Sequence, residues 1–209
     1  MNRNDDLEFA IQHSVAISDH FSANLSESAE LDNRGLLANA YLCIALDHRE
    51  AILLLVASGA HSSATALQRP LLEAFVTGAW LFASATEGEL QGMLALTRPP
   101  PKFESMSQRL RKTHDLGEWF EYFRKHYEIL GDYTHGHQRQ LSRWLGNGTI
   151  APRHHHEQMI EVLHHCDVVG LLAAVHREKI AGCSIDALMG LLDDVMLRAR
   201  GVEAVLHGR

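Results

Sequence analysis

The chain has few cysteines and no long apolar run. Its three cysteines are spread over 209 residues without a C-x-x-C pair, so neither a disulfide framework nor a cysteine zinc site is expected. The longest apolar run, 51–57, is much shorter than a membrane span. The N-terminal residues contain no apolar signal region. These absences predict a cytoplasmic protein with no membrane partner.

The chain also lacks a basic excess, because 19 Lys and Arg residues face 26 Asp and Glu residues and the formal net charge is −7. This balance excludes a surface that coats DNA in general. One local basic cluster remains, formed by Lys102, Arg109, Arg111 and Lys112. A solvated helix face is its simpler interpretation, and contact with phosphate is the alternative.

Strand patterns are absent as well, since no stretch alternates polar and apolar residues over the length of a strand. Apolar residues instead recur at helical spacing between Gly, Pro and polar breaks. The length suits one domain, 1–209, with a core over about 5–206. We therefore predict an all-α, single-domain antiparallel helical bundle. Wide apolar faces on the late helices predict a homodimer. The expected helices cover 4–25, 36–58, 61–85, a short helix from 86, 103–113, 115–130, 133–144, 153–181 and 184–206.

Arg69 and Glu73 are the most informative residues, because they interrupt the apolar segment 63–82 and are four residues apart. On a helix they share one face, and a buried charge needs a partner. Pro70 between them has no N–H, which leaves the carbonyl of Ala66 without its helical donor. The pair is either a structural pin of the fold or the floor of a site.

The second distinctive stretch is 131–144. Gly131 is expected to end one helix, and Asp132 to cap the next over 133–144. On that helix His135 and Arg139 lie one turn apart, with Tyr133 close by. Histidine can move protons near neutral pH, and arginine binds phosphate as a planar fork. The alternative is that Tyr133 and His135 are buried and satisfied by Glu73 or a backbone carbonyl.

These two stretches carry a resemblance. The segment S-A-x-A-L-x-R-P-L-L-E-A from 63, followed by G-A-W-L at 78–81 and D-Y-T-H-G at 132–136, resembles a bacterial family of uncharacterised helical proteins. The similarity runs from about 36 to 177, and that family is distantly similar to HEPN domains. It points to Arg69, Glu73, Asp132, Tyr133 and His135 as the positions to test.

The HEPN resemblance implies a metal-independent ribonuclease, a toxin or defence protein acting on RNA or a nucleotide at a dimer interface. The HEPN pattern of Arg, four to six residues and His occurs here as Arg109 and His114, and such a short pattern also arises by chance. In an enzyme of this kind His135 is the general acid or base. Arg69 or Arg139 stabilises phosphate charge, and Glu73 orients one of them.

Two other functions stay open. The first is a non-catalytic helical binding or interaction module with a structural Arg-Glu-Tyr-His network, so the sequence leaves open whether the chain is an enzyme. The second is a metal protein, because the chain has 15 histidines and places Glu157, Glu161 and His165 on one helix face. A di-metal carboxylate bundle needs a second Glu-x-x-His, which is missing. No metal and no cofactor are therefore predicted.

Overall fold

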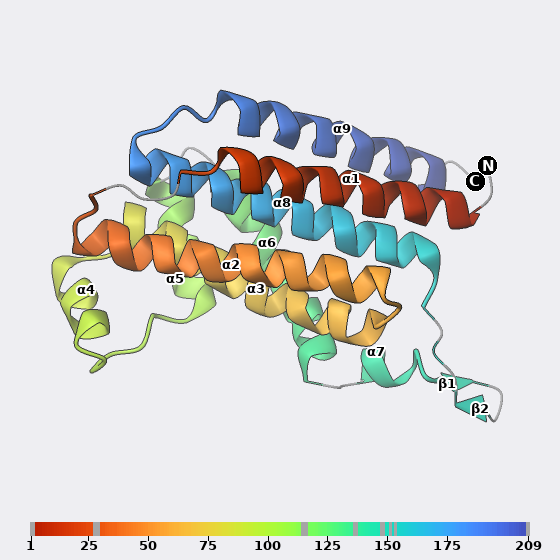
Figure 1. The fold of residues 1–209 in the computed structure, drawn as a ribbon. Coiled ribbons are helices and arrows are strands. Elements are labelled where there is room, and N and C mark those ends of the chain that lie inside the picture. The colour runs from red at the N-terminus through yellow and green to blue at the C-terminus, as the bar shows by residue number, and fades with distance from the viewer. Residues whose placement is uncertain are drawn as a thin grey trace.

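The computed structural model places five long helices side by side with roughly aligned axes (Figure 1). It describes residues 3–26, 30–113, 117–135, 138–146, 149–150, 152 and 154–207. The long helices are α1 (Arg3–Asn24), α2 (Asn33–Ala57), α3 (His61–Ala83), α8 (His156–Ala181) and α9 (Asp186–His207). The shorter elements are α4 (Glu87–Leu94), α5 (Phe103–Thr113), α6 (Gly117–Thr134), α7 (Gln138–Leu141), β1 (Leu145–Gly146) and β2 (Thr149–Ile150).

Helix α8 is the centre of the fold, because it packs against α1, α2, α3 and α9. Most of its side chains between Met159 and His176 are buried, as a helix that is apolar on all sides requires. It is also long and apolar enough to cross a membrane by length and composition. However, 83% of that apolar window is buried inside the protein. A core helix has the same properties, so this is weak evidence for a membrane span.

A buried ion pair joins α2 to α8 within this core. The guanidinium of Arg49 donates to Oδ1 of Asp167 from Nε at 3.0 Å and from Nη2 at 2.6 Å, and the two side chains are 0% and 1% exposed. Ser14 of α1 donates to Oδ2 of Asp167 at 2.5 Å, and its carbonyl accepts a bond from Arg49. Gly170 leaves the space that the Arg49 side chain fills, because a Cβ there would lie 3.0 Å from Cγ of Arg49. Three helices thus share one buried polar network.

Helices α5 and α6 pack against each other and against α3. Phe75 of α3, which is fully buried, is in contact with α6. Its ring stacks on Phe120 at 6.0 Å between centroids and meets Phe123 edge-on at 5.9 Å. His176 of α8 meets the same ring edge-on at 5.4 Å. This aromatic cluster holds α6 against the long helices.

The all-α prediction is confirmed, with one small exception in the described part of the chain. Residues 145–146 and 149–150 pair as a two-stranded antiparallel hairpin. The expected short helix from 86 begins with a capping box, since Thr86 Oγ accepts from the N–H of Glu89 while the Glu89 carboxylate accepts from the N–H of Thr86. Asp115, the expected first residue of α6, lies outside the described residues.

The prediction for 131–144 is wrong. Gly131 does not end a helix and Asp132 does not cap one, because α6 continues through both to Thr134. Residues 138–141 then form a single helical turn before the hairpin. The glycine serves close packing, since a Cβ at Gly131 would collide with Nη1 of Arg69. A position that reads as a helix end is therefore a contact between α6 and α3.

Candidate functional site

Arg69 and Glu73 form the expected pair on α3, and Tyr127 of α6 completes it. Arg69 donates from Nε to Oε1 of Glu73 at 3.0 Å and from Nη2 to the Tyr127 hydroxyl at 2.7 Å. Tyr127 in turn donates to the same Oε1 at 2.6 Å. These three side chains form a closed triangle of hydrogen bonds between α3 and α6.

The triangle lies at the surface rather than in the core. The side chains of Arg69 and Glu73 are 21% and 43% exposed, so the expectation of a fully buried pair is wrong. Phe103 of α5 stacks flat on Tyr127 with centroids 3.9 Å apart, and the guanidinium of Arg69 lies 4.2 Å from the centre of the tyrosine ring. Contact between the cation and the ring adds to the hydrogen bonds.

The environment of Tyr127 favours its neutral form. Burial, followed by the hydrogen bond and negative charge of Glu73, raises the pKa of Tyr127 to about 12 against the opposing effect of Arg69. A raised folded-state pKa stabilises the fold below the ordinary value near 10. That contribution is lost as the pH rises through about 12. The hydroxyl is therefore a hydrogen-bond donor at neutral pH and not a base.

Replacing Glu73 with Gln is expected to move the pKa of Tyr127 down toward its ordinary range, because the negative charge near the hydroxyl is lost. Titration of ¹³Cζ-labelled tyrosine by NMR can resolve the four tyrosines of the chain. Tyr122, which is exposed, is the internal control. An unchanged Tyr127 titration in Glu73→Gln would contradict the hydrogen-bonded triangle.

The other proposed catalytic residues do not join this triangle. Arg69 and Glu73 have no hydrogen bond or ion pair other than those within the triangle among the described residues. Tyr133 accepts a bond at 2.7 Å from Arg143, whose guanidinium also donates to Gln158. Arg139 pairs at 3.0 Å with Asp132, and both are largely exposed. His135 is exposed after the end of α6. The shared helix face predicted for His135 and Arg139 is absent, since α6 ends before His135 and Arg139 lies on the separate helix α7.

The end of α6 and the stretch after it do contact α3, through Thr134 and Trp144. Thr134 donates from its hydroxyl to the carbonyl of Ala66 at 3.1 Å. This is the carbonyl that Pro70 leaves without a helical donor, and Thr134 supplies the missing bond. Nearer the start of α3, Trp144 donates from Nε1 to the hydroxyl of Ser62 at 2.9 Å.

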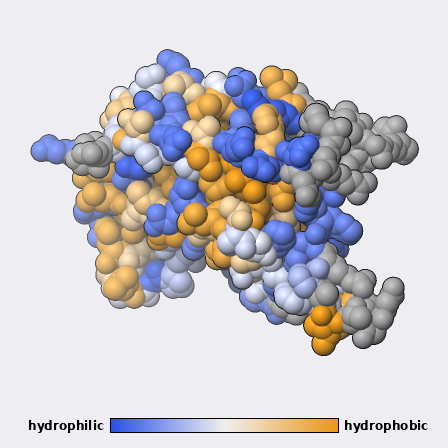
Figure 2. Space-filling view, turned by 45° about the vertical axis from the view of Figure 1, so that its right-hand side comes forward, coloured by the Kyte–Doolittle hydropathy of each residue, from blue (hydrophilic) through white to orange (hydrophobic). Residues whose placement is uncertain are grey.

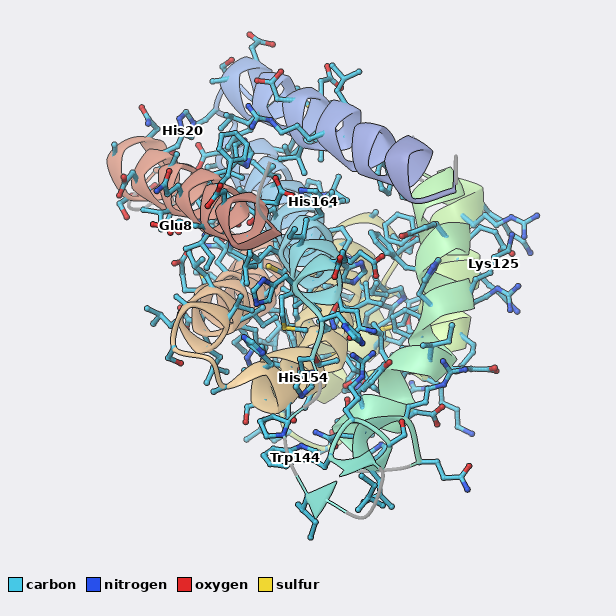
Figure 3. All side chains as sticks on the ribbon, turned by 90° about the vertical axis from the view of Figure 1, so that its right-hand side faces the viewer. Glu8, His20, Lys125, Trp144, His154 and His164 are labelled. Carbon is cyan, nitrogen blue, oxygen red and sulfur yellow. The ribbon has the colours of Figure 1, made fainter. Side chains whose placement is uncertain are left out.

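A pair of histidines lies beside Ser62. The rings of His61 and His154 meet edge-on with centroids 5.4 Å apart, and Nε2 of His154 lies 3.0 Å from Oγ of Ser62. Figure 3 shows His154 and Trp144 at this end of the molecule. Burial lowers the pKa of both histidines; Arg143 lowers that of His154 further, and His156 that of His61. Both rings are neutral at pH 7.

The residues of the metal hypothesis are dispersed. His165 meets Phe123 edge-on at 6.2 Å, and burial lowers its pKa to about 4. Glu161, by contrast, is exposed. Among the residues with described positions, no group of three or more His, Cys, Asp or Glu side chains is placed to hold a metal ion. The face formed by Glu157, Glu161 and His165 is therefore not a metal centre in this part of the chain.

Arg109, the first residue of the Arg–His pattern, packs between helices. Arg109 donates to Glu89 at 2.8 Å and to the carbonyl of Ser84, and it lies over the Trp80 ring. The bond from Arg109 lowers the pKa of Glu89 to about 2. Arg109 thus ties α5 to α4 and to the end of α3. His114 lies outside the described residues.

Comparison with known proteins finds one family that matches the chain. A family model described as "Family of unknown function (DUF6988)" matches residues 42–185. The chain belongs to this family. The DUF6988 match includes Arg49, Asp167 and the Arg69–Glu73–Tyr127 triangle, but Ser14 of α1 precedes it. No curated protein matches the chain, and no solved structure matches it.

Proposed function

We propose that this DUF6988 protein is a non-catalytic, HEPN-like helical binding module in which the Arg69–Glu73–Tyr127 triangle is structural. The observation that supports this proposal most directly is that the three side chains of the triangle bond to one another. Arg69, Glu73 and Tyr127 bond to one another in a closed set, and Tyr127 is held neutral. A catalytic group needs a donor or acceptor directed at a substrate, whereas these groups are directed at one another.

Exposed apolar side chains on α2 support the proposal that this protein binds a partner. Leu36, Ile44 and Leu54 are 54%, 44% and 68% exposed, and Leu36 and Leu54 lie on the same face of α2. Figure 2 shows apolar side chains gathered in patches on one face of the molecule. Exposed apolar patches mark interaction surfaces. A homodimer in the cytoplasm remains part of the proposal. Helix α8 is buried inside the protomer, whereas α1, α2 and α9 each expose large apolar side chains.

A metal-independent ribonuclease is the second candidate, and one grouping favours it. Arg143 bonds to Tyr133 at the end of α6 and lies near His154, and His154 and the partly exposed Trp144 both contact Ser62. A neutral histidine can accept a proton, an arginine can bind phosphate, and a tryptophan can stack on a base. However, His154 already contacts Ser62, and Arg143 already holds Tyr133 and Gln158.

Cleavage of end-labelled mixed RNA in the presence of EDTA distinguishes the two candidates. We expect no cleavage by the purified wild-type protein, and the same result for His135→Ala, His154→Ala and Arg69→Ala. Glu73→Ala should also be inactive but should unfold at a lower temperature than the wild type, because it removes the acceptor that two donors share. Cleavage by the wild type that is lost in folded His135→Ala or His154→Ala would overturn the proposal and identify the catalytic histidine.

A further inference from the structure

A cavity of about 280 Å³ is lined by residues of α5 and α6. All of its lining residues except one phenylalanine are polar or charged, which suits a small charged ligand. The lining residues are Ser107, Gln108, Arg111, Phe120, Glu121 and Arg124.

Ser107 is the unusual member of this set. Its side chain is only 2% exposed, and its Oγ has no hydrogen-bond partner. Buried hydroxyl groups in folded proteins are almost always paired, so an unpaired one needs an explanation. A ligand oxygen in the cavity that Ser107 lines would accept this hydroxyl's bond.

Two arginines face the same cavity from different helices. Arg124 donates to Glu121 from Nη2 at 2.9 Å and from Nε at 3.3 Å, while Arg111 donates to Glu121 from Nη1 at 3.2 Å. The carboxylate thereby holds the two guanidinium groups on either side of it. Nε and Nη2 of Arg111 and Nη1 of Arg124 have no partner among the described residues. Both arginines also remain open to solvent, with side chains 62% and 44% exposed.

Two lysines add positive charge beside the two arginines of the cavity, although the net charge of the chain is −7. Lys112 and Lys125 follow the two arginines in the sequence and are exposed. Figure 3 shows Lys125 directed outward from α6 among other nitrogen-tipped side chains. Among the described residues, Arg111, Arg124 and Lys125 act on Glu121, and Glu128 acts on Arg124 as well. Such a local excess attracts anions even on an acidic protein.

We propose that this cavity binds a phosphate group, either as inorganic phosphate or as the terminal group of a phosphomonoester. The free N–H groups of Arg111 and Arg124 bind its oxygens from two sides, and the Ser107 hydroxyl donates to a third oxygen. Three donors from two helices suit a tetrahedral, doubly charged group. The inference deepens the proposed binding function by giving the module a ligand class, and in that sense it rests on that function.

Titration of the ¹⁵N-labelled full chain with inorganic phosphate, and separately with O-phosphoserine, tests the site by NMR. Sodium chloride at matched ionic strength is the control for screening. We expect saturable shifts of α5 and α6 amides with at least one of the two ligands. If phosphate alone binds, the free ion is the ligand; if phosphoserine binds more tightly, the cavity takes a phosphomonoester.

The double variant Arg111→Gln/Arg124→Gln is expected to bind at least about tenfold more weakly, because it removes charge-assisted donors. Ser107→Ala should also weaken binding while keeping the fold, since it removes an unpaired hydroxyl. Arg98→Gln, an exposed arginine between α4 and α5, should bind as the wild type does. Thermal unfolding confirms that each variant is folded.

No saturable shift with either ligand, or equal binding by the wild type and the double variant, would overturn the phosphate site. Neither result bears on catalysis, which the RNA cleavage assay decides by itself. Conversely, RNA cleavage by the wild type would overturn the non-catalytic function without removing phosphate binding. The two failures are therefore distinguishable.

Discussion

Replacing Asp167 with Ala is expected to lower the free energy of unfolding by about 3–5 kcal/mol, the usual cost of removing one partner from a buried ion pair. The change leaves the guanidinium of Arg49 buried and without its main counter-ion, while Ser14 loses the acceptor of its hydroxyl. Three helices are affected at once, because these residues lie on α1, α2 and α8. Urea unfolding followed by circular dichroism measures the difference.

A surface ion pair supplies the control for this prediction. Asp132 pairs with Arg139 at a similar distance, but the side chains are 40% and 55% exposed. Exposed pairs contribute at most about 1 kcal/mol, so Asp132→Ala should unfold close to the wild type. If Asp167→Ala were as stable as Asp132→Ala, the Arg49–Asp167 pair would not be the polar centre of the fold.

The sequence did contain a signal for Arg49 that its charged neighbours hide. Arg49 lies in the run Asp-His-Arg-Glu at 47–50, which reads as a solvated segment. Its register is nevertheless that of the core, because Leu42, Ala45, Ile52 and Val56 occupy the same buried face of α2. A charged residue at a core position needs a partner from another helix. Which helix supplies it depends on packing, and Asp167 is 118 residues away.

Local rules predicted the helices well, and they predicted contacts between helices less well. The proline in α3 and its free carbonyl follow from covalent geometry, so the polar partner of Ala66 could be expected in kind, although not as Thr134. Gly131 was misread because a glycine serves a helix end or a close approach equally well. The same prediction placed Tyr133, and not Tyr127, beside Glu73. Only the packing of α6 on α3 shows that Tyr127 completes the pair of Arg69 and Glu73.

The proposed phosphate site could not be predicted from the sequence alone either. The basic residues of α5 were visible in the sequence, but a solvated helix face explained them equally well. What favours a site is the arrival of Arg124 from α6 beside Arg111, together with the buried and unpaired hydroxyl of Ser107. Both depend on how α5 and α6 pack, and neither has a signature in the spacing of residues along one helix.

Replacing Phe75 with Ala is the second change with a large expected effect, a loss of about 3–5 kcal/mol in the free energy of unfolding. Its ring is fully buried and contacts Phe120 and Phe123 of α6 and His176 of α8, so truncation leaves a cavity where three helices meet. Because this cluster anchors α6, the α6 amides should also exchange hydrogen faster than those of α8. Urea unfolding and native-state hydrogen exchange measure the two effects.

Phe82 is the matched control on the same helix. Its side chain is 38% exposed, so Phe82→Ala removes less buried area and should cost under about 2 kcal/mol. Faster exchange confined to α6 in Phe75→Ala would show that α6 can detach from the long helices as a unit. Equal losses of stability in the two variants would contradict the anchoring role of the aromatic cluster. Since Phe120 also lines the cationic cavity, detachment of α6 would weaken phosphate binding in Phe75→Ala and not in Phe82→Ala.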